Sequence, residues 1–549
     1  MSESDFTRRA LIRAALAAAP LAAFDWEALP AKADTPNKDD FDAVIIGAGL
    51  GGLSCATAFA RKGFRPLVVE KHDKPGGYAT AFSRAGGFVF DVSLHSTSVG
   101  ERNGVHNLIG GFPEIKDVEF VAHPYLYRAI FPQHDIRVRQ RNLRAYLAQL
   151  SDRFPEESAG IEGLFEDAQN LLEEVQKISR AQEQADPVLF PVEYPTLYRC
   201  GMLSWGQMVD ARLRDPKLKA IVSAQWQYYG LPPSKLASFY YALPAIGYLE
   251  QGGYYPKGRS QDISNALVKF IEAHGGKVML NTRVERILAE NGAAYGIQCE
   301  GGKQFRGRAV ISNASAGQTF YQMLDEDPES DDGTFMDYKA RLAQFSRSLS
   351  CFQVFLGLNR DLVGKLELPD SEVFLLPSYD HEALYDSAQR ADVERDGICV
   401  TLYDNLFNSY SPRHKNTVNL IVLQGFDHWV RFEKDYRAGR KTEYNAEKER
   451  MAQVLIARAE EALLPGLSKA IEVKEIGTPL TNWRYTANDR GAIYGWDQTV
   501  DNSGANRIGH ATPIKNLYLA GAWSRPGHGY GGVIQSGLEC FSEIVGQWV

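Results

Sequence analysis

A glycine-rich turn near the beginning of the sequence restricts the fold more than any other feature. An apolar run over 41–46 ends in the turn 47–52 (GAGLGG), and apolar spacing typical of a helix follows over 53–61. A second apolar run over 66–69 ends in Glu70. Strand, glycine turn, helix, strand and acid, in this order within about thirty residues, are the fingerprint of a Rossmann-like dinucleotide-binding unit. The segment therefore predicts an α/β fold that holds a dinucleotide.

Four residues of this segment have defined roles in such a unit. Gly47 permits the tight turn, Gly49 lets the backbone approach a pyrophosphate, and Gly52 allows the helix to pack closely on its strand. The amides and the dipole at the helix N-terminus then face the phosphates. Glu70 lies where a carboxylate accepts hydrogen bonds from the ribose hydroxyls. We expect all four residues to shape or contact the dinucleotide.

The residues after Glu70 indicate which dinucleotide binds. Lys71 follows the acid, and the pair Gly76 and Gly77 comes shortly afterwards. An acid followed by such a Gly-Gly pair resembles the FAD-binding extension of glutathione-reductase-like and amine-oxidase-like flavoproteins. FAD is therefore the expected cofactor.

The far end of the sequence repeats the pattern of strand, glycine turn and helix. An apolar strand runs into Gly521 and Ala522, and a second glycine-rich stretch ends at Gly532 and Val533, where helical apolar spacing begins. A helix N-terminus of this kind attracts negative charge. The resemblance to flavoproteins implies that this helix points at the pyrimidine edge of the flavin. Both ends of the chain should therefore meet at one site.

More widely, the sequence resembles the superfamily of phytoene desaturases, carotenoid isomerases and retinol saturases. The resemblance rests on residues 41–95, 252–258, 310–314 and 481–541. It implies a Rossmann-like FAD-binding domain of the glutathione-reductase or amine-oxidase type, assembled from discontinuous segments, with an α+β substrate domain. It also implies that Val284 contacts the adenine through its backbone.

The matching segments divide the chain into two predicted domains. The FAD-binding domain is expected to comprise 41–103, 252–329 and 481–549, and the substrate domain 104–251 and 330–480. Within the substrate domain, the apolar segments 351–357 and 417–424 have the pattern of buried strands in a sheet over the flavin.

Aromatic residues gather in one stretch of the predicted substrate domain. The stretch contains Trp226, Tyr228, Tyr229, Phe239, Tyr240, Tyr241 and Tyr248. This density suits a long apolar pocket for an alkene or a lipid. Each ring could equally belong to the core of a helical region.

Three residues are candidates for chemistry because the resemblance places their segments near the flavin: His95, Tyr485 and His528. His528 could touch the substrate, be attached covalently to the flavin, or only bond to loop backbone. His95 could instead be a satisfied residue behind the site, and Tyr485 could serve only in packing. Relatives usually have Gly where this chain has Ser93, Arg259 and His528.

The resemblance implies an FAD-dependent oxidoreductase acting on an apolar unsaturated substrate, such as an isoprenoid, carotenoid, retinoid or terpene. Hydride transfer between a substrate carbon and flavin N5 would give desaturation, saturation or isomerisation. Two alternatives stay open, an exported flavin amine or amino-acid oxidase and a non-catalytic or partner-dependent FAD subunit of a heteromeric dehydrogenase. The sequence has no second dinucleotide fingerprint, so an external electron acceptor or donor is expected.

The first 33 residues have the pattern of an export signal. An arginine pair at 8–9 precedes a short apolar run over 14–24, and residues 31–33 form an A-x-A cleavage pattern. The run is too short to span a bilayer, and the arginine pair resembles a twin-arginine signal. We expect a signal peptide over 1–33, a polar linker over 34–40 and export to a bacterial periplasm. An Ala-rich amphipathic helix with adjacent arginines is the alternative.

Net charge and cysteine content limit which ligands and partners the chain can have. The formal charge is −8, with 60 Lys+Arg against 68 Asp+Glu, which argues against nucleic acid because phosphate binding needs clustered Lys and Arg. The six cysteines are scattered without a C-x-x-C pair, so neither a disulfide framework nor a metal site is expected. Export would require these thiols to be buried. The expected ligand is an apolar small molecule, with peripheral membrane contact rather than a transmembrane span, in a chain that could form a homo- or hetero-oligomer.

Overall fold

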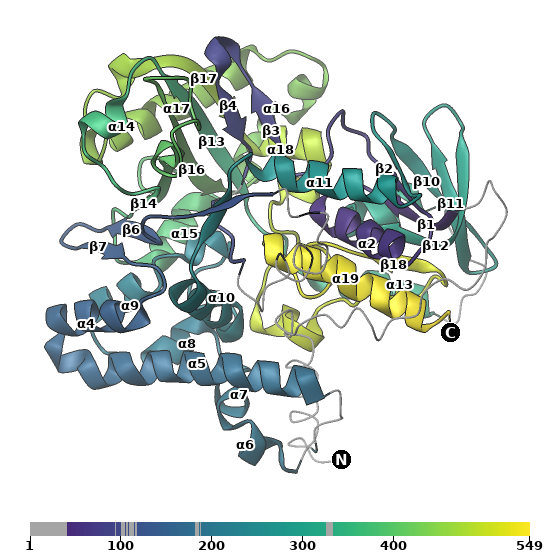
Figure 1. Ribbon diagram of the computed structural model, residues 1–549, viewed down its shortest axis with the longest axis horizontal. Helices are drawn as coiled ribbons and strands as arrows, with labels where there is room; N and C mark the ends of the chain where they lie inside the picture. Colours follow the sequence, from purple (N-terminus) through teal and green to yellow (C-terminus); the bar gives the residue numbers. More distant parts are fainter. Residues whose placement is uncertain are drawn as a thin grey trace.

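The computed structural model of the chain describes residues 41–93, 95–99, 118–181, 188–324 and 333–548, together with residues 105, 108, 115 and 186. The predicted signal peptide over 1–33 and the linker over 34–40 lie outside the described residues. Within the described part, two seven-stranded sheets lie side by side, and a group of helices occupies the lower left of the view (Figure 1).

The first sheet contains the predicted dinucleotide-binding strands. In spatial order its strands are β10 (Val284–Glu290), β11 (Ala293–Cys299), β12 (Gln304–Ser312), β1 (Phe41–Ile46), β2 (Pro66–Val69) and β9 (Lys277–Met279), and β18 (Leu517–Leu519) pairs with β12. β1 runs parallel to β2 and β12, and β12 runs parallel to β18. Buried apolar runs suit these strands because both faces of a parallel sheet are covered. The predicted assembly of this sheet from separated segments is confirmed.

Three helices cover one face of the first sheet: α2 (Leu50–Arg61), α11 (Ser260–Ala273) and α19 (Tyr530–Gly546). Gly52 allows α2 to begin close to β1, because a Cβ at this position would lie 2.2 Å from the Gly47 carbonyl oxygen. The Ser54 hydroxyl of α2 donates to the Ile534 carbonyl of α19 at 3.0 Å. The two ends of the described chain therefore lie side by side, coloured purple and yellow in Figure 1.

The second sheet is mainly antiparallel and lies over the other side of the molecule. Its spatial order is β17 (Ile471–Gly477), β13 (Ser350–Leu358), β16 (Asn416–Gln424), β15 (Ile398–Thr401), β14 (Glu372–Leu375), β6 (Tyr127–Ile130) and β7 (Asp135–Val138). β13 and β16 pair antiparallel and cover the predicted strands 351–357 and 417–424, so these predictions are confirmed. The helices α14 (Leu362–Lys365), α15 (His381–Gln389), α16 (Asp427–Arg437), α17 (Thr442–Ala462) and α18 (Pro479–Thr486) accompany this sheet.

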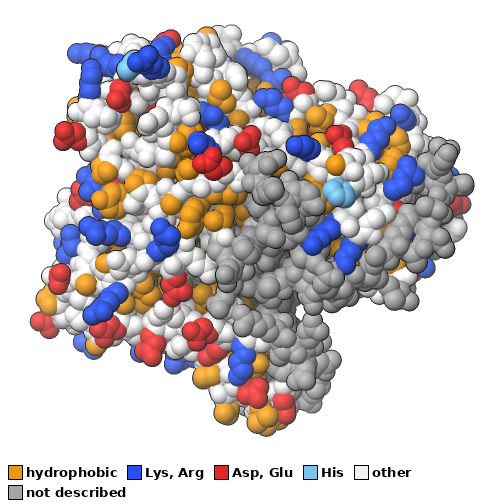
Figure 2. Space-filling model, in the orientation of Figure 1, with side chains coloured by type: hydrophobic (Ala, Val, Ile, Leu, Met, Phe, Trp, Pro, Cys, Tyr) orange, Lys and Arg blue, Asp and Glu red, His pale blue; other side chains and the backbone are white. Residues whose placement is uncertain are grey.

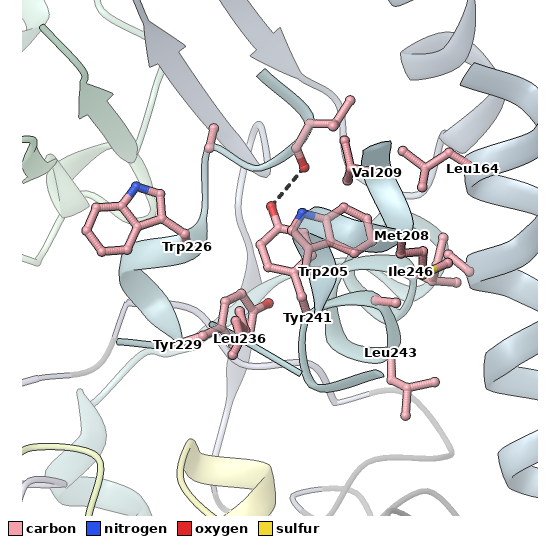
Figure 3. Packing of buried hydrophobic residues seen from close by; sticks show 14 of the residues in the cluster. Leu164, Trp205, Met208, Val209, Trp226, Tyr229, Leu236, Tyr241, Leu243 and Ile246 are labelled. Atoms are coloured by element: carbon pink, nitrogen blue, oxygen red, sulfur yellow. Dashed lines mark hydrogen bonds between the residues drawn. The ribbon is translucent and has the colours of Figure 1, made fainter. Parts of the chain in front are cut away.

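The helical region has its own aromatic core. Its helices are α4 (Leu143–Arg153), α5 (Ser158–Ala181), α6 (Phe190–Glu193), α7 (Pro195–Cys200), α8 (Trp205–Asp210), α9 (Pro216–Val222) and α10 (Ser238–Gln251). Trp205 stacks on Tyr241 with ring centroids 4.4 Å apart, and the Tyr241 hydroxyl donates to the Val222 carbonyl at 2.9 Å (Figure 3). Trp226 is buried in the same cluster. Trp226 and Tyr241 of the aromatic stretch thus serve in packing.

Smaller elements join these parts: β3 (Ala81–Ser83) with β4 (Val89–Asp91), β5 (Phe120–Ala122) with β8 (Tyr254–Pro256), α12 (Ala316–Gln318) and α13 (Thr334–Gln344). Phe335 and Leu342 of α13 are buried with residues of β1 and β12. This helix therefore packs on the first sheet, although the sequence places the domain boundary after residue 329.

The surface mixes charges of both signs. On the face drawn in Figure 2, Lys and Arg side chains are interspersed with Asp and Glu, and hydrophobic side chains gather near the middle. Among the described residues, no helix combines the length and apolarity needed to cross a membrane. All six cysteines are free and buried, including Cys55 in α2, as export would require.

Candidate active site

A cavity of 1270 Å³ is lined by residues of both sheets and of the helical region. Its wall includes the β1–α2 turn, the start of β10, α10, β13 and the loop before α19. Ligand pockets commonly measure about 300–1,000 Å³, so this volume has room for a large cofactor and part of a substrate.

The structure gathers most of the expected cofactor residues around this cavity. The lining includes Gly47, Gly49, Glu70, Lys71, Gly76, Gly77, Val284, Ala522, Gly532 and Val533. Gly52 and Gly521 are not part of the lining and shape the site from behind. A Cβ at Gly521 would lie 2.4 Å from the Asn313 Oδ1 atom, so only glycine leaves this asparagine in place.

Glu70 holds the glycine turn in position. The Ala48 amide donates to one of its carboxylate oxygens at 2.8 Å, and the His72 amide donates to the other at 2.9 Å. Hydrogen bonds to a charged acceptor are the stronger kind. Glu70 therefore fixes the loop that faces the cavity, in addition to the predicted contact with a ribose.

Two helix N-termini open toward the cavity without side-chain caps. The N-cap residues are Gly49 for α2 and Gly529 for α19, and neither provides a capping side chain. The first-turn amides are thus available to an anionic or dipolar group. A Cβ at Gly49 would lie 2.8 Å from Asn313 Nδ2, so any larger residue in the turn would displace this asparagine. These features fit the pyrophosphate and flavin ends of FAD.

Comparison with known proteins shows which family this chain belongs to. A family model described as flavin containing amine oxidoreductase matches residues 50–544. The chain belongs to this family. It is therefore a flavin-containing oxidoreductase, and FAD is the flavin implied by its two glycine turns.

Two proteins that are similar in sequence to this chain are named for different enzyme activities. Prolycopene isomerase 1, chloroplastic, of an Oncidium hybrid cultivar is 26% identical over 517 residues, covering 92% of this chain and 84% of that protein. All-trans-retinol 13,14-reductase of Danio rerio is 26% identical over 535 residues, covering 92% and 86%.

Solved structures show the same fold. Putrescine oxidase with bound putrescine has a TM-score of 0.59 at 14% identity, covering 93% of this chain and 99% of that one. An oxidoreductase from Methanosarcina mazei also has a TM-score of 0.59, at 17% identity, covering 91% and 99%. The predicted α/β fold with an FAD-binding and a substrate part is thereby confirmed.

One part of the cavity wall of this oxidoreductase is free of charged side chains. Residues 227–248 and 351–423 contribute Gln227, Tyr228, Tyr229, Phe239, Tyr240, Leu243, Pro244, Tyr248, Cys351, Gln353, Phe355, Cys399, Ile421 and Leu423. Charged lining residues come from other segments, for example Lys448 from α17 and Glu475 from β17, and the nucleotide end adds Glu70 and Lys71. We call the uncharged part the chamber. Most rings of the aromatic stretch lie in its wall, whereas Trp226 and Tyr241 do not.

His528 lies in the cavity wall just before α19. Its ring stacks on Tyr494 with centroids 4.4 Å apart and lies 5.0 Å from the Tyr240 ring. Among the described residues, neither ring nitrogen has a hydrogen-bond partner; the Tyr240 hydroxyl donates to the His528 carbonyl instead. Burial, assisted by Arg507, lowers the pKa of His528 to about 3. The ring is therefore neutral and can exchange a hydrogen bond with a bound molecule.

His95 and Tyr485 also line the cavity but differ in environment. His95 is surrounded by chamber residues, with its ring centroid 5.1 Å from that of Tyr228 and its Nδ1 atom 3.9 Å from Cys399 Sγ. Burial lowers its pKa to about 4. Tyr485 is 50% exposed and packs edge-on against His72, so it lies on the open side of the cavity.

One residue beside the chamber is a functional candidate that the motifs do not point to. Glu372 begins β14, is buried, and accepts a hydrogen bond from the Tyr228 hydroxyl. Its only signal in the sequence is an acid at the start of the apolar run 372–375. A carboxylate in a buried strand requires an explanation because burial penalises its charge.

Proposed function

We propose that this flavin-containing oxidoreductase acts on an apolar, unsaturated substrate of the isoprenoid class, such as a carotenoid, retinoid or terpene. The observation that carries the proposal is the chamber, whose lining contains no Asp, Glu, Lys or Arg side chain. Its titratable groups are also neutral near pH 7, because burial lowers the pKa of His95 and raises those of Tyr228 and Cys399 well above their usual ranges. An uncharged wall favours a hydrocarbon over an amine or an acid.

The relatives support the same substrate class. They are named for prolycopene, a carotenoid, and for all-trans-retinol, a retinoid, and each alignment covers 92% of this chain. One name describes an isomerisation and the other a reduction. The comparison therefore supports a kind of substrate without choosing the direction of the reaction.

The residues of the chain would bind and orient the reactants. When bound, FAD supplies hydride transfer to or from a substrate carbon. The N-terminus of α2 would hold the pyrophosphate and that of α19 the pyrimidine edge, with Glu70 at the ribose and Val284 at the adenine. The chamber would exclude water, and the neutral ring of His528 would bond to the molecule beside it.

An amine oxidase on the same fold has less support. A cation is attracted to an aromatic face when it lies within about 6 Å of the ring centre. Tyr494 and His528, however, stack directly with centroids 4.4 Å apart at 28°, so no ammonium group fits between them. The likeness to putrescine oxidase shows the fold alone.

A substrate screen tests the proposed function. The purified chain, loaded with FAD, is incubated without oxygen with retinol, lycopene isomers and cyclic terpenes, while the visible spectrum and the extracted products are monitored. We expect flavin bleaching or a changed polyene. Peroxide release with putrescine or benzylamine instead would establish the amine oxidase, and a flavin-loaded but silent chain would favour the partner-dependent subunit.

We further propose that electrons pass to or from a partner outside this chain. We also propose that the protein takes up its substrate at a lipid surface. Val188, Leu189 and Val192 around α6 are large apolar side chains that are 71%, 47% and 78% exposed. Flotation with phosphatidylcholine vesicles should carry the wild type, and Val192→Asp should reduce the bound fraction. Equal flotation of the two proteins would remove α6 from the proposal.

Export by the twin-arginine route to a periplasm is also a proposal. Its support is the order of arginine pair, apolar run and A-x-A pattern in residues 1–33. Replacing Arg8 and Arg9 by Lys should keep the protein in the cytoplasm, and the exported protein should begin near Asp34. An intact Met1 on periplasmic protein would contradict the cleavage.

A further inference from the structure

A buried carboxylate lies directly behind the chamber wall. Glu372 is 1% exposed and is not part of the cavity lining, whereas Tyr228 is. The Tyr228 hydroxyl donates to one oxygen of Glu372, and the Tyr403 hydroxyl donates to the other at 3.4 Å. Tyr228 is therefore the side chain that joins Glu372 to the chamber.

No cation compensates Glu372 in the described part of the chain. The titratable groups that face it are Tyr228 from the helical region, Tyr248 from α10, Cys399 from β15 and Tyr403, all uncharged near neutral pH. Arg128 of β6 and Arg137 of β7, on the neighbouring strands, pair with Asp370 instead. His123, also nearby, is joined to Ser371 through its Nδ1 atom at 2.7 Å.

This arrangement does not stabilise the fold. A buried carboxylate without an opposite charge pays a desolvation penalty that two hydroxyl donors only partly offset. Burial accordingly raises the pKa of Glu372 to about 7, with the bonds from Tyr228 and Tyr403 opposing the rise. The carboxyl group can thus take up or release a proton near neutral pH. An apolar residue at this position of β14 would serve packing better.

We infer that Tyr228 and Glu372 form the proton-transfer pair of the chamber, with Tyr228 touching the substrate and Glu372 holding the proton behind it. The inference rests on the proposed function, because oxidation or reduction of a carbon–carbon bond moves one proton as well as one hydride. His95, whose ring lies 5.1 Å from the Tyr228 ring, limits the positions that the phenol can adopt. Glu372 acts through Tyr228 and is a positioning residue.

The proton balance is the following. In the dehydrogenating direction, a substrate C–H bond breaks, its electron pair forms the new carbon–carbon double bond, and its proton goes to the Tyr228 oxygen. The phenol proton moves at the same time to a Glu372 oxygen, so Tyr228 is unchanged and Glu372 becomes neutral. The neighbouring carbon loses a hydride in the flavin-dependent half of the reaction. Saturation runs these proton movements in reverse, and the open cavity returns the proton to water after product release.

Three variants test the pair in the flavin-loaded chain with a polyene substrate. Tyr228→Phe should lower kcat by about 100-fold or more with little change in KM, since general acid–base groups contribute about 10²–10⁴-fold. Glu372→Gln still accepts the Tyr228 hydrogen bond but cannot take up a proton, so it should lower kcat and remove the inflection near pH 7 from the rate profile. Glu372→Asp should restore part of both.

Matched control variants separate chemistry from folding. Tyr241→Phe removes a buried hydroxyl that donates to a backbone carbonyl away from the cavity. Asp396→Asn changes another buried acid with a raised pKa, bonded to the Gly397 amide and absent from the cavity lining. Both controls should keep the wild-type pH profile, even if they unfold more easily.

A measurement without substrate keeps the two proposals distinct. Infrared difference spectra of the purified chain, titrated across neutral pH, should show a protonated carboxyl band that Glu372→Gln removes and that Tyr228→Phe shifts. If the band behaves so but no polyene reacts, the substrate class is wrong and the proton-holding pair stands. A Glu372→Gln protein with the wild-type infrared titration, or with the wild-type rate and pH profile, would overturn the pair.

Discussion

Burial without a partner of opposite charge determines the protonation state of several side chains in this oxidoreductase. His95 and His528 of the cavity wall have lowered pKa values and Tyr494 has a raised one, so each is held in its neutral form by the same desolvation. A lone buried acid, Glu372, responds in the same direction and becomes easier to protonate. The chamber therefore carries no fixed charge, and the few groups that can change protonation stand out from their surroundings.

Glu70 gives a direct test of the nucleotide end of the site. Glu70→Ala removes the acceptor for the Ala48 and His72 amides and should loosen the glycine turn. Hydrogen bonds to charged groups contribute about 1.5–3 kcal/mol each, so we expect the Kd for FAD to rise at least about tenfold. Quenching of FAD fluorescence on titration measures this. Unchanged affinity in a folded Glu70→Ala protein would show that the turn needs no such support.

His381 gives a pH-dependent test at the same scale. Its Nε2–H donates to the Ala220 carbonyl at 2.8 Å, which leaves the buried Nδ1 atom unprotonated and without a partner among the described residues. Burial lowers the pKa to about 4 from the ordinary value of 6.5. The unfolded chain therefore binds more protons in this window, and the stability contributed by the neutral ring is present above pH 6.5 and lost as the pH falls toward 4.

His381→Gln retains a donor for the Ala220 carbonyl but does not titrate. Between pH 7 and pH 5 the wild type should lose about 2 kcal/mol more stability than this variant, since each pH unit in the window is worth about 1.4 kcal/mol. Urea unfolding of the flavin-loaded proteins at the two pH values gives the difference. Parallel losses in both proteins would mean that His381 is protonated in the folded state.

At the scale of elements, the sequence predicts best where a local pattern and the tertiary environment agree. The strands 351–357 and 417–424 are mostly apolar and are buried along nearly their whole length, so the pattern alone locates β13 and β16. The aromatic stretch is different, because Trp226 and Tyr228 lie only two residues apart in one 3₁₀ turn. One is buried in the core and the other lines the chamber, a choice made by contacts with distant elements.

Glu372 shows the same limit for the site. Its partner Tyr228 is 144 residues away and Tyr403 is 31 residues away, beyond the next strand, so no spacing rule connects the three side chains. The glycine turns, by contrast, are predictable because their function requires a fixed order of strand, turn and helix. The sequence predicts a motif whose residues are close together in the chain, such as a glycine turn, but it does not predict contacts between side chains from separate segments.

The start of α11 carries a strain that a substitution can reveal. Arg259 has φ 68° and ψ 179°, a backbone region that is normally restricted to glycine and that costs other residues about 1–3 kcal/mol. Its guanidinium lies 4.3 Å from the centre of the Tyr410 ring and donates to the Tyr410 carbonyl. These contacts offset the strain where relatives are expected to have glycine.

Two substitutions at this position separate strain from contact. Arg259→Ala keeps the strained backbone and loses the Tyr410 contacts, whereas Arg259→Gly loses the contacts but relieves the strain. We expect the alanine variant to be less stable than the glycine variant by about 1–3 kcal/mol. Thermal unfolding of the two proteins compares them. Equal stability would indicate that the α11 N-terminus relaxes when the arginine is absent.

At the scale of the whole molecule, the cofactor site joins segments that lie far apart in the sequence. Its lining combines residues 47–77, Val284 and residues 522–533, and the chamber adds the helical region and the second sheet. A ligand that touches all of these parts binds only the folded chain and stabilises it as a unit. Such stabilisation reaches about 2.7 kcal/mol when the ligand concentration is one hundred times its Kd.

Ligands that fill only part of the site should stabilise the protein less. ADP contains the adenosine and pyrophosphate but no flavin, so it should engage Glu70, Val284 and the α2 N-terminus without reaching α19. We expect FAD to raise the melting temperature of the cofactor-free chain more than ADP does at equal ligand concentration, because its additional contacts give it the lower Kd. Differential scanning fluorimetry at several ligand concentrations measures both shifts.

Val533→Asp provides the control for this comparison. An acid in the first turn of α19 is favourable for the helix itself, because it interacts with the positive end of the helix dipole. The same carboxylate, in a position that lines the cavity, would repel electron-rich atoms of the flavin ring. The FAD shift should therefore fall toward the ADP shift, while the ADP shift stays at its wild-type value. If the variant lowered both shifts equally, α19 would support the fold of the whole site and not the flavin end alone.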